Sequence, residues 1–212
     1  MSINIYLQTK IFIACPANVA TGGPELLHQL GYHLINDLGV ETYIFYYNYD
    51  ERKNISPMHA EYQLYNVPYV IKIPLDEDVN ENILIVPEII NGINLLINYE
   101  KIRKIIWWLS VDNLYLSIVL NSKKYFIFER LINKASNIIL KRNIFDINEL
   151  TLQNINNIKL TNKISKMIVN VNLNFVQSHY ALNYINIKYA ITQSKIAYLS
   201  DYLNQEFLKI QT

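Results

Sequence analysis

The sequence is poor in cysteine, with a single residue of that type, and it has no long uninterrupted apolar run. One cysteine, Cys15, excludes an internal disulfide framework and suits a reducing compartment. The apolar run Ile105–Val111 is interrupted by Asp112 and Asn113, whereas a membrane-spanning helix needs about 18 apolar residues. We therefore expect a cytoplasmic protein in which Cys15 is part of a buried core.

The sequence also lacks an excess of charge of either sign, because 19 Lys and Arg face 18 Asp and Glu. A chain with this balance has no general attraction to nucleic acid, so we expect no nucleic-acid partner. Within this balance, two segments carry opposite net charges. Residues 41–100 carry ten acids and three bases, whereas residues 123–166 carry nine bases and three acids.

Glycine is scarce, with only five residues, and two of them follow the first apolar run. Ile11–Cys15 is too short for a helix and predicts a strand. Gly22 and Gly23 then end a loop and tolerate unusual backbone angles, while Pro24 suits the first turn of a helix. Gly39 is placed to end that helix.

The rest of the chain continues this alternation. Apolar runs predict strands at residues 40–47, 67–73, 83–86, 104–110, 173–176 and 195–199, and helical spacing predicts helices at 89–99, 128–139 and 179–187. Such a pattern predicts an α/β protein with a Rossmann-like, doubly wound parallel β-sheet flanked by helices. We expect one domain over residues 1–212, with a basic helical insertion at about residues 121–166.

Polar residues gather where the predicted strands end. Parallel sheets of this type bind ligands beyond the carboxyl ends of their strands, at the point where the strand order reverses. The residues at these positions are Pro16–Gly23, Asn48, Glu88, Ser110, Asp112, Asn113, Gln177 and Ser178.

The glycine loop does not fit two common nucleotide-binding patterns. There is no G-x-G-x-x-G, and no Gly-Lys-Ser/Thr follows the glycines. Gly22 and Gly23 before a helix can still hold an anion with their backbone N–H groups, or they can form a plain tight turn.

Five motifs in order resemble bacterial glycosyltransferases of the GT-B fold, in particular the family-4-like group that builds capsule and lipopolysaccharide glycans. The resemblance spans nearly the whole chain. The motifs are TGGPELLHQ at residues 21–29, VPE at 86–88, WWLSVDN at 107–113, FVQSHYA at 175–181 and YLSDY at 198–202.

The resemblance implies roles for the residues at the strand ends. Thr21, Gly22, Gly23 and Glu25 would form the loop near the donor's diphosphate and sugar. Glu88 and Asp112 would be catalytic, as a base or as groups that orient the acceptor. Residues expected on the acceptor side are Asn48, Asn113, Gln177 and Ser178.

Structural roles are the alternative for several of these residues. Glu88 could be a helix-start charge, and Asp112 with Asn113 could form a cap or turn. His28 is expected to be structural, and Trp107 and Trp108 are expected in the core.

The resemblance also implies that this chain is one half of an enzyme. It corresponds to the N-terminal, acceptor-binding domain, and the donor-binding domain would be supplied in cis or in trans. The donor would be a nucleotide-sugar, the acceptor a glycan or lipid-linked glycan, and the chain alone would transfer little. A non-catalytic module that binds a glycan, a partner or a membrane is the alternative. We expect no cofactor within the chain and no metal, since the four histidines form no ligand-spaced cluster.

The basic segment carries a further hypothesis. Lys123, Lys124 and Arg130 lie near aromatic residues on a predicted amphipathic helix, which could rest peripherally on the inner face of an anionic membrane. The alternative is a helix packed on the sheet with solvated lysines.

Overall fold

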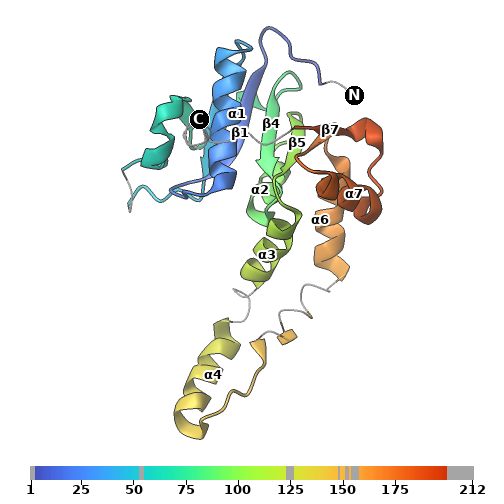
Figure 1. The fold of residues 1–212 in the computed structure, drawn as a ribbon. Helices are drawn as coiled ribbons and strands as arrows, with labels where there is room; N and C mark the ends of the chain where they lie inside the picture. Colours follow the sequence, from blue (N-terminus) through green and yellow to red (C-terminus); the bar gives the residue numbers. More distant parts are fainter. Residues whose placement is uncertain are drawn as a thin grey trace, which may run out of the picture.

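The fold is built around one parallel β-sheet. The computed structural model describes residues 3–52, 55–122, 127–147, 149–150, 153 and 158–199. Seven strands pair in the order β3-β2-β1-β4-β5-β6-β7, and every pair is parallel (Figure 1). The strands are β1 (Lys10–Pro16), β2 (Glu41–Tyr47), β3 (Tyr69–Val70), β4 (Ile83–Pro87), β5 (Arg103–Trp108), β6 (Leu173–Val176) and β7 (Ile196–Tyr198).

Helices connect the strands and cover both faces of the sheet. The predicted Rossmann-like, doubly wound α/β fold is therefore confirmed. The helices are α1 (Gly22–Asn36), α2 (Ile90–Leu95), α3 (Val111–Ser122), α4 (Ile127–Leu140), α6 (Ile158–Asn170) and α7 (His179–Tyr189), and short 3-10 turns include η1 (Ala60–Tyr65) and η3 (Leu96–Asn98).

The hydrophobic core lies in two layers, one on each face of the sheet. On one face, Leu27, Leu30 and Leu34 of α1 pack on the inward side chains of the central strands. On the other face, α2, α3, α6 and α7 bury residues such as Ile93 and Ile168. Strands buried on both faces explain why the sequence shows continuous apolar runs instead of alternation.

Several predictions about the core are confirmed. Trp107 and Trp108 are fully buried on opposite faces of β5, and Cys15 is buried in the layer under α1. Gly39 has a φ of +64° and its N–H bonds to the Ile35 carbonyl at 3.1 Å, which ends α1 as predicted.

Three predicted segments differ from the structure. The strand predicted at residues 67–73 pairs only at Tyr69–Val70, because Pro68 lies at its start and it forms the edge of the sheet. Leu38, which continues the helical spacing of Leu27, Leu30 and Leu34 in the sequence, lies beyond the end of α1 and is exposed. Helix α6 was not among the predicted helices, and its Ile164 and Ile168 are buried.

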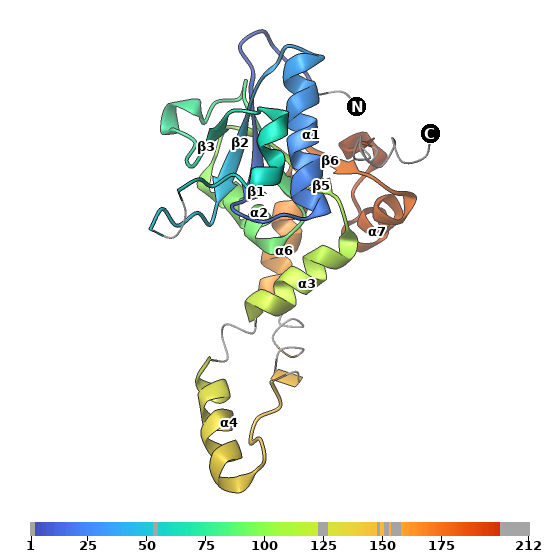
Figure 2. The same cartoon turned by 60° about the vertical axis from the view of Figure 1, so that its left-hand side comes forward.

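The carboxyl ends of the strands share one edge of the sheet, which we call the carboxyl edge. It faces α3 in Figures 1 and 2, and α4 lies further out in the same direction. Within the part of the chain that the structure describes, no helix combines the length and apolar character needed to cross a bilayer.

Candidate functional site

The strand order reverses between β1 and β4, which are neighbours at the centre of the sheet. After β1 the chain passes into α1 on one face, and after β4 it passes into α2 on the other. The two connections therefore diverge, and the ends of β1, β4 and β5 border the position where open α/β sheets bind ligands. We call this the switch point.

Helix α1 begins at the switch point with two glycines. Its N-cap residue Thr21 makes no side-chain capping bond, and Pro24 has no N–H. A Cβ atom built on Gly22 would have nothing within 4 Å. Neither Gly22 nor Gly23 has a positive φ, so the backbone geometry does not require glycine there. The Glu25 N–H already bonds to the Thr21 carbonyl at 3.1 Å, so the N–H groups of Gly22 and Gly23 are the donors that this turn offers to an anion.

The loop before α1 is held in place by Tyr62 of η1. The Tyr62 hydroxyl accepts a hydrogen bond from the Thr21 N–H at 2.9 Å and donates one to the Thr21 carbonyl at 3.0 Å. The Tyr62 ring stacks on His28, with ring centroids 4.4 Å apart. Sequence reasoning missed Tyr62, because it lies 41 residues from Thr21 and no motif or spacing connects the two.

His28 is buried beneath this loop and has a structural role, as expected. Its Nδ1 lies 2.6 Å from the Pro24 carbonyl oxygen, which can only accept, so Nδ1 carries the ring proton. Nε2 therefore accepts from the Tyr46 hydroxyl at 2.6 Å. Burial lowers the pKa of His28 from 6.5 to about 4, so the ring is neutral at neutral pH.

Glu88 is buried just past the end of β4, with 1 % of its surface exposed. Its carboxylate accepts hydrogen bonds from the backbone N–H groups of Leu109 at 3.1 Å and Ser110 at 2.9 Å. The Asn113 side chain also bonds to it. Burial nevertheless raises the pKa of Glu88 from 4.5 to about 7, so this group can hold or release a proton near neutral pH.

The glycine start of α1 and the Glu88 turn lie side by side. A Cβ atom built on Gly23 would be 3.6 Å from Cδ1 of Leu109. Gly22, Gly23, Leu109, Ser110 and Glu88 therefore form a continuous strip at the switch point, which we call the switch-point strip. It combines open backbone N–H donors with a carboxyl group whose pKa is near neutral.

The other predicted site residues are more dispersed. Asp112 lies exposed in the first turn of α3, next to the strip. Ser178 caps α7 by accepting from the Ala181 N–H at 3.1 Å. Glu25 accepts from the Tyr65 hydroxyl at 3.0 Å, on the side of α1 that faces η1.

The remaining predicted residues occupy three different places. Asn48 is exposed after β2 with a φ of 59°, and Gln177 is partly buried after β6. Arg130 lies on α4, away from the sheet (Figure 1). Lys123 and Lys124 lie outside the described residues.

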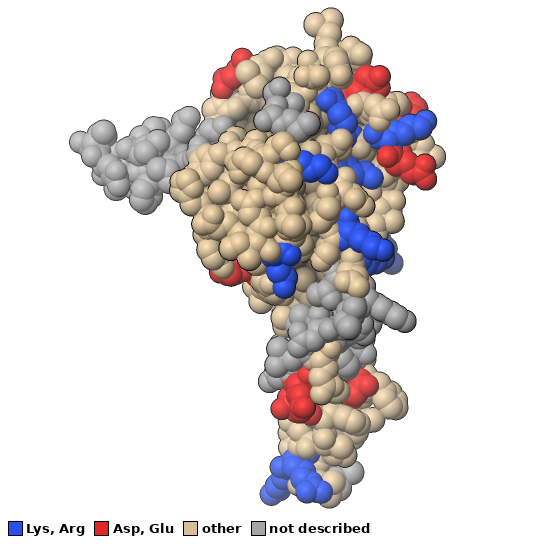
Figure 3. All heavy atoms as spheres, turned by 90° about the vertical axis from the view of Figure 1, so that its right-hand side faces the viewer, with Lys and Arg blue, Asp and Glu red and all other residues tan. Residues whose placement is uncertain are grey.

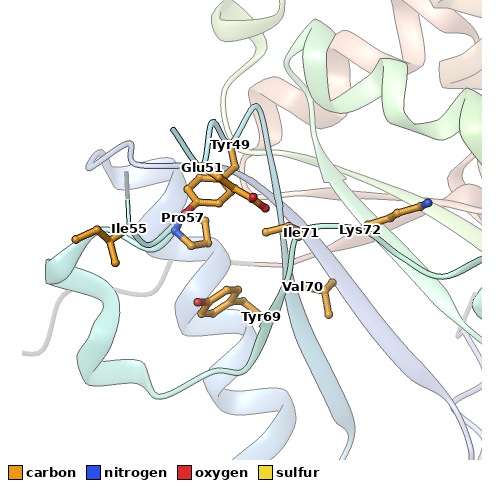
Figure 4. A pocket seen from close by; sticks show the side chains of 8 residues that line it. All are labelled: Tyr49, Glu51, Ile55, Pro57, Tyr69, Val70, Ile71 and Lys72. Atoms are coloured by element: carbon orange, nitrogen blue, oxygen red, sulfur yellow. The ribbon is translucent and has the colours of Figure 1, made fainter. Parts of the chain in front are cut away.

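A pocket of about 610 Å³ lies at the carboxyl ends of β2 and β3, and sequence reasoning did not identify it. Figure 4 shows the rings of Tyr49 and Tyr69 on this pocket with the carboxylate of Glu51 beside Tyr49, whereas the ammonium of Lys72 points away from them. A second hollow of similar volume adjoins it and shares Tyr49 and Glu51. Aromatic faces with a few charged groups suit a small ligand rich in hydroxyls.

The chain matches no protein-family model, and a comparison with curated protein sequences finds no match. In the described ranges, no three histidine, cysteine, aspartate or glutamate side chains are grouped so that they could hold a metal ion. The functional argument therefore depends on the geometry of the site.

Proposed function

We propose that this chain is the acceptor-side domain of a glycosyltransferase that uses a nucleotide-sugar and extends a bacterial surface glycan. The switch-point strip is the observation that carries the proposal. Open N–H groups at the start of α1 suit the diphosphate of a nucleotide-sugar, whose negative charge is also favoured by the helix dipole.

Glu88 supports the proposal by fixing the turn that borders the glycine start of α1. Sugar transfer to a hydroxyl releases a proton from the acceptor, and the group that takes it must contact the acceptor. Because Glu88 lies behind the Leu109–Ser110 backbone, its direct contribution is to hold that turn. Asp112 is the exposed carboxylate beside the strip and is the better candidate for contact with an acceptor.

The pocket beside Tyr49 and Tyr69 supports an acceptor glycan. Sugar rings present apolar C–H faces that pack on aromatic rings, and their hydroxyls donate to carboxylates such as Glu51. The pocket and the strip lie along the same carboxyl edge, so one extended acceptor could contact both.

The chain alone is expected to transfer little sugar. A nucleotide-sugar needs contacts that hold its base and ribose, and group transfer needs donor and acceptor held together in one geometry. A donor-binding domain, in cis or in trans, would supply those contacts.

The test is a transfer assay with labelled nucleotide-sugars and lipid-linked glycan acceptors. The chain would be assayed alone and together with the polypeptide encoded directly downstream. Transfer that requires both supports the proposal. Absence of transfer in both samples, with a folded chain, contradicts it.

A non-catalytic glycan-binding module is the second candidate. The burial of Glu88 favours it, because the carboxylate bonds to backbone N–H groups within the fold. Glycan-array binding that depends on Tyr49 and Tyr69, without transfer in any combination, would support this candidate.

A further inference from the structure

Helix α4 stands away from the sheet. Figures 1 and 2 both show it beyond α3, on the side of the carboxyl edge. None of the described side chains of α4 belongs to either layer of the core. The alternative in which this helix packs on the sheet is therefore wrong for residues 127–140. We refer to residues 127–147 as the arm.

The residues that follow α4 within the arm fold back along the polar side of this helix; we call them the returning chain. Asn133 Oδ1 accepts from the N–H groups of Ile144 at 2.9 Å and Phe145 at 2.8 Å, and Asn133 Nδ2 donates to the Phe145 carbonyl at 2.7 Å. The Ser136 hydroxyl lies 3.0 Å from the Arg142 carbonyl. Asn133 and Ser136 are both buried.

The apolar side of α4 is exposed instead. Ile127, Phe128, Leu131 and Ile138 expose 59 %, 71 %, 59 % and 76 % of their surface. At about 100° per residue, these four side chains fall within an arc of about 100° on one side of the helix. We call them the apolar stripe. An exposed apolar surface of this kind marks a site that another apolar surface covers.

Cations border the apolar stripe. Arg130 and Lys134 are exposed, lie one turn apart and project beside the stripe, while Lys141 and Arg142 follow the end of the helix. Glu129 projects on the side that the returning chain covers. Figure 3 shows Lys and Arg at the tip of the arm and Asp and Glu nearer the body of the domain.

We propose that the apolar stripe inserts into the interface of an anionic lipid bilayer. An amphipathic helix binds such an interface with its apolar side between the acyl chains and its cations against the headgroups. A second copy of the chain is disfavoured as the occupant, because pairing two stripes would bring two sets of bordering cations together. The positive charges beside the apolar stripe therefore favour binding to an anionic surface.

The arm extends from the same edge of the sheet as the switch-point strip. Bilayer binding would hold that edge near the membrane surface. The inference does not depend on sugar transfer, because it rests on the exposure and charge of α4 alone. Vesicle binding and transfer activity can therefore succeed or fail separately.

The test is flotation of the whole chain with lipid vesicles. We expect binding to vesicles of phosphatidylcholine and phosphatidylglycerol in equal parts, and much weaker binding to phosphatidylcholine alone. Phe128→Ser and Ile138→Asn should each lower the partition coefficient by about tenfold. Ile187→Asn is the matched control, because Ile187 is 86 % exposed on α7, outside the arm.

Two double variants test how much the cations on α4 contribute to vesicle binding. Arg130→Gln with Lys134→Gln should weaken binding to the anionic vesicles, and added salt should reduce the difference from the wild type. Lys163→Gln with Lys166→Gln removes two exposed cations from α6 and should leave binding unchanged. An equal loss of vesicle binding in both double variants would show that the cations beside the apolar stripe have no specific role.

A fluorescent label gives a second readout. Cys15 is fully buried, so a cysteine introduced at position 131 is the accessible thiol of the described chain. A polarity-sensitive dye on Leu131→Cys should shift to shorter wavelength with anionic vesicles, whereas the dye on Ile187→Cys should not. The proposal is overturned if the chain does not float with anionic vesicles, or if Phe128→Ser and Ile138→Asn float as the wild type does. It is also overturned if these variants instead convert a dimer to a monomer.

Discussion

The Glu88 carboxylate accepts a hydrogen bond from the Ser110 N–H at 2.9 Å, which connects the end of β4 to the turn between β5 and α3. The same carboxylate accepts from Leu109 at 3.1 Å. Leu109 in turn borders Gly23 at the start of α1. One buried side chain therefore fixes the relative positions of the strand ends that make up the switch-point strip.

Replacing Glu88 should destabilise the fold, and the loss should be larger when more of its hydrogen bonds are removed. Glu88→Ala leaves two backbone N–H groups without their acceptor and should cost about 2–4 kcal/mol. Glu88→Gln retains one acceptor oxygen and should cost less. Urea unfolding at pH 5, where the stabilising contribution of Glu88 is still largely present, measures both values. Equal stability of Glu88→Ala and the wild type would show that water replaces the carboxylate without cost.

The stability contribution of Glu88 should fall as the pH rises. The pKa of Glu88 is about 7 in the fold against 4.5 in the unfolded chain, so between these values the folded protein binds more protons. The stabilisation is complete below pH 4.5 and is lost as the pH rises through about 7, on the order of 3 kcal/mol in total. The difference in unfolding free energy between the wild type and Glu88→Gln isolates this contribution. A difference that stays constant or increases with pH would contradict the assignment.

The wild type itself should show a flatter pH profile, because His28 acts in the opposite direction. Its pKa is about 4 in the fold against 6.5 in the unfolded chain. Its contribution is complete above pH 6.5 and is lost as the pH falls toward 4. In Glu88→Gln only the contribution of His28 remains, so its unfolding free energy should rise between pH 4 and 6.5. In the wild type, the opposite contributions of Glu88 and His28 offset each other over the same range.

Tyr62 should control the motion of the loop before α1. Tyr62→Phe keeps the ring stacked on His28 but removes the hydroxyl that bonds to Thr21. Hydrogen exchange at the Thr21 amide should become faster, with a loss of stability of about 1 kcal/mol. Tyr65→Phe is the control, because its hydroxyl bonds to Glu25 and Gln29 and leaves Thr21 untouched. Unchanged exchange at Thr21 in Tyr62→Phe would contradict the role of the hydroxyl.

Two glycines at helix positions should respond oppositely to the same change. A Cβ atom at Gly92 of α2 would lie 2.7 Å from the Pro87 carbonyl oxygen, so Gly92→Ala should cost about 1–3 kcal/mol. Gly22→Ala meets nothing within 4 Å and should leave stability unchanged or slightly raised. Thermal unfolding of the two variants distinguishes them. Equal effects would show that α2 shifts away from Pro87.

The doubly wound parallel class of the fold followed from the sequence, because buried parallel strands are short apolar runs between helical segments. The order of the strands, which places the switch point between β1 and β4, came from the structure. The edge strand β3 was predicted too long, since only pairing with β2 decides where it ends. Helix α6 was missed because polar Asn and Lys residues dilute the spacing of Ile164 and Ile168.

The contacts of the site were less predictable than its location. The position of Glu88 at a strand end was predicted, but its bonds to Leu109 and Ser110 depend on how β4 and β5 align. Tyr62 comes from a 3-10 turn whose placement has no local sequence signal. The exposed apolar side of α4 could not be distinguished from a core side, because both have the same helical spacing.

The most direct test of the central claim is transfer from a labelled nucleotide-sugar by a matched pair of Gly22 variants, together with the polypeptide encoded downstream. Gly22→Asp places a negative charge where the diphosphate would lie, yet it is compatible with the first turn of a helix. We predict that Gly22→Ala transfers as the wild type does and that Gly22→Asp loses about tenfold or more. Equal transfer by both variants, or full transfer by the chain alone, would contradict the account.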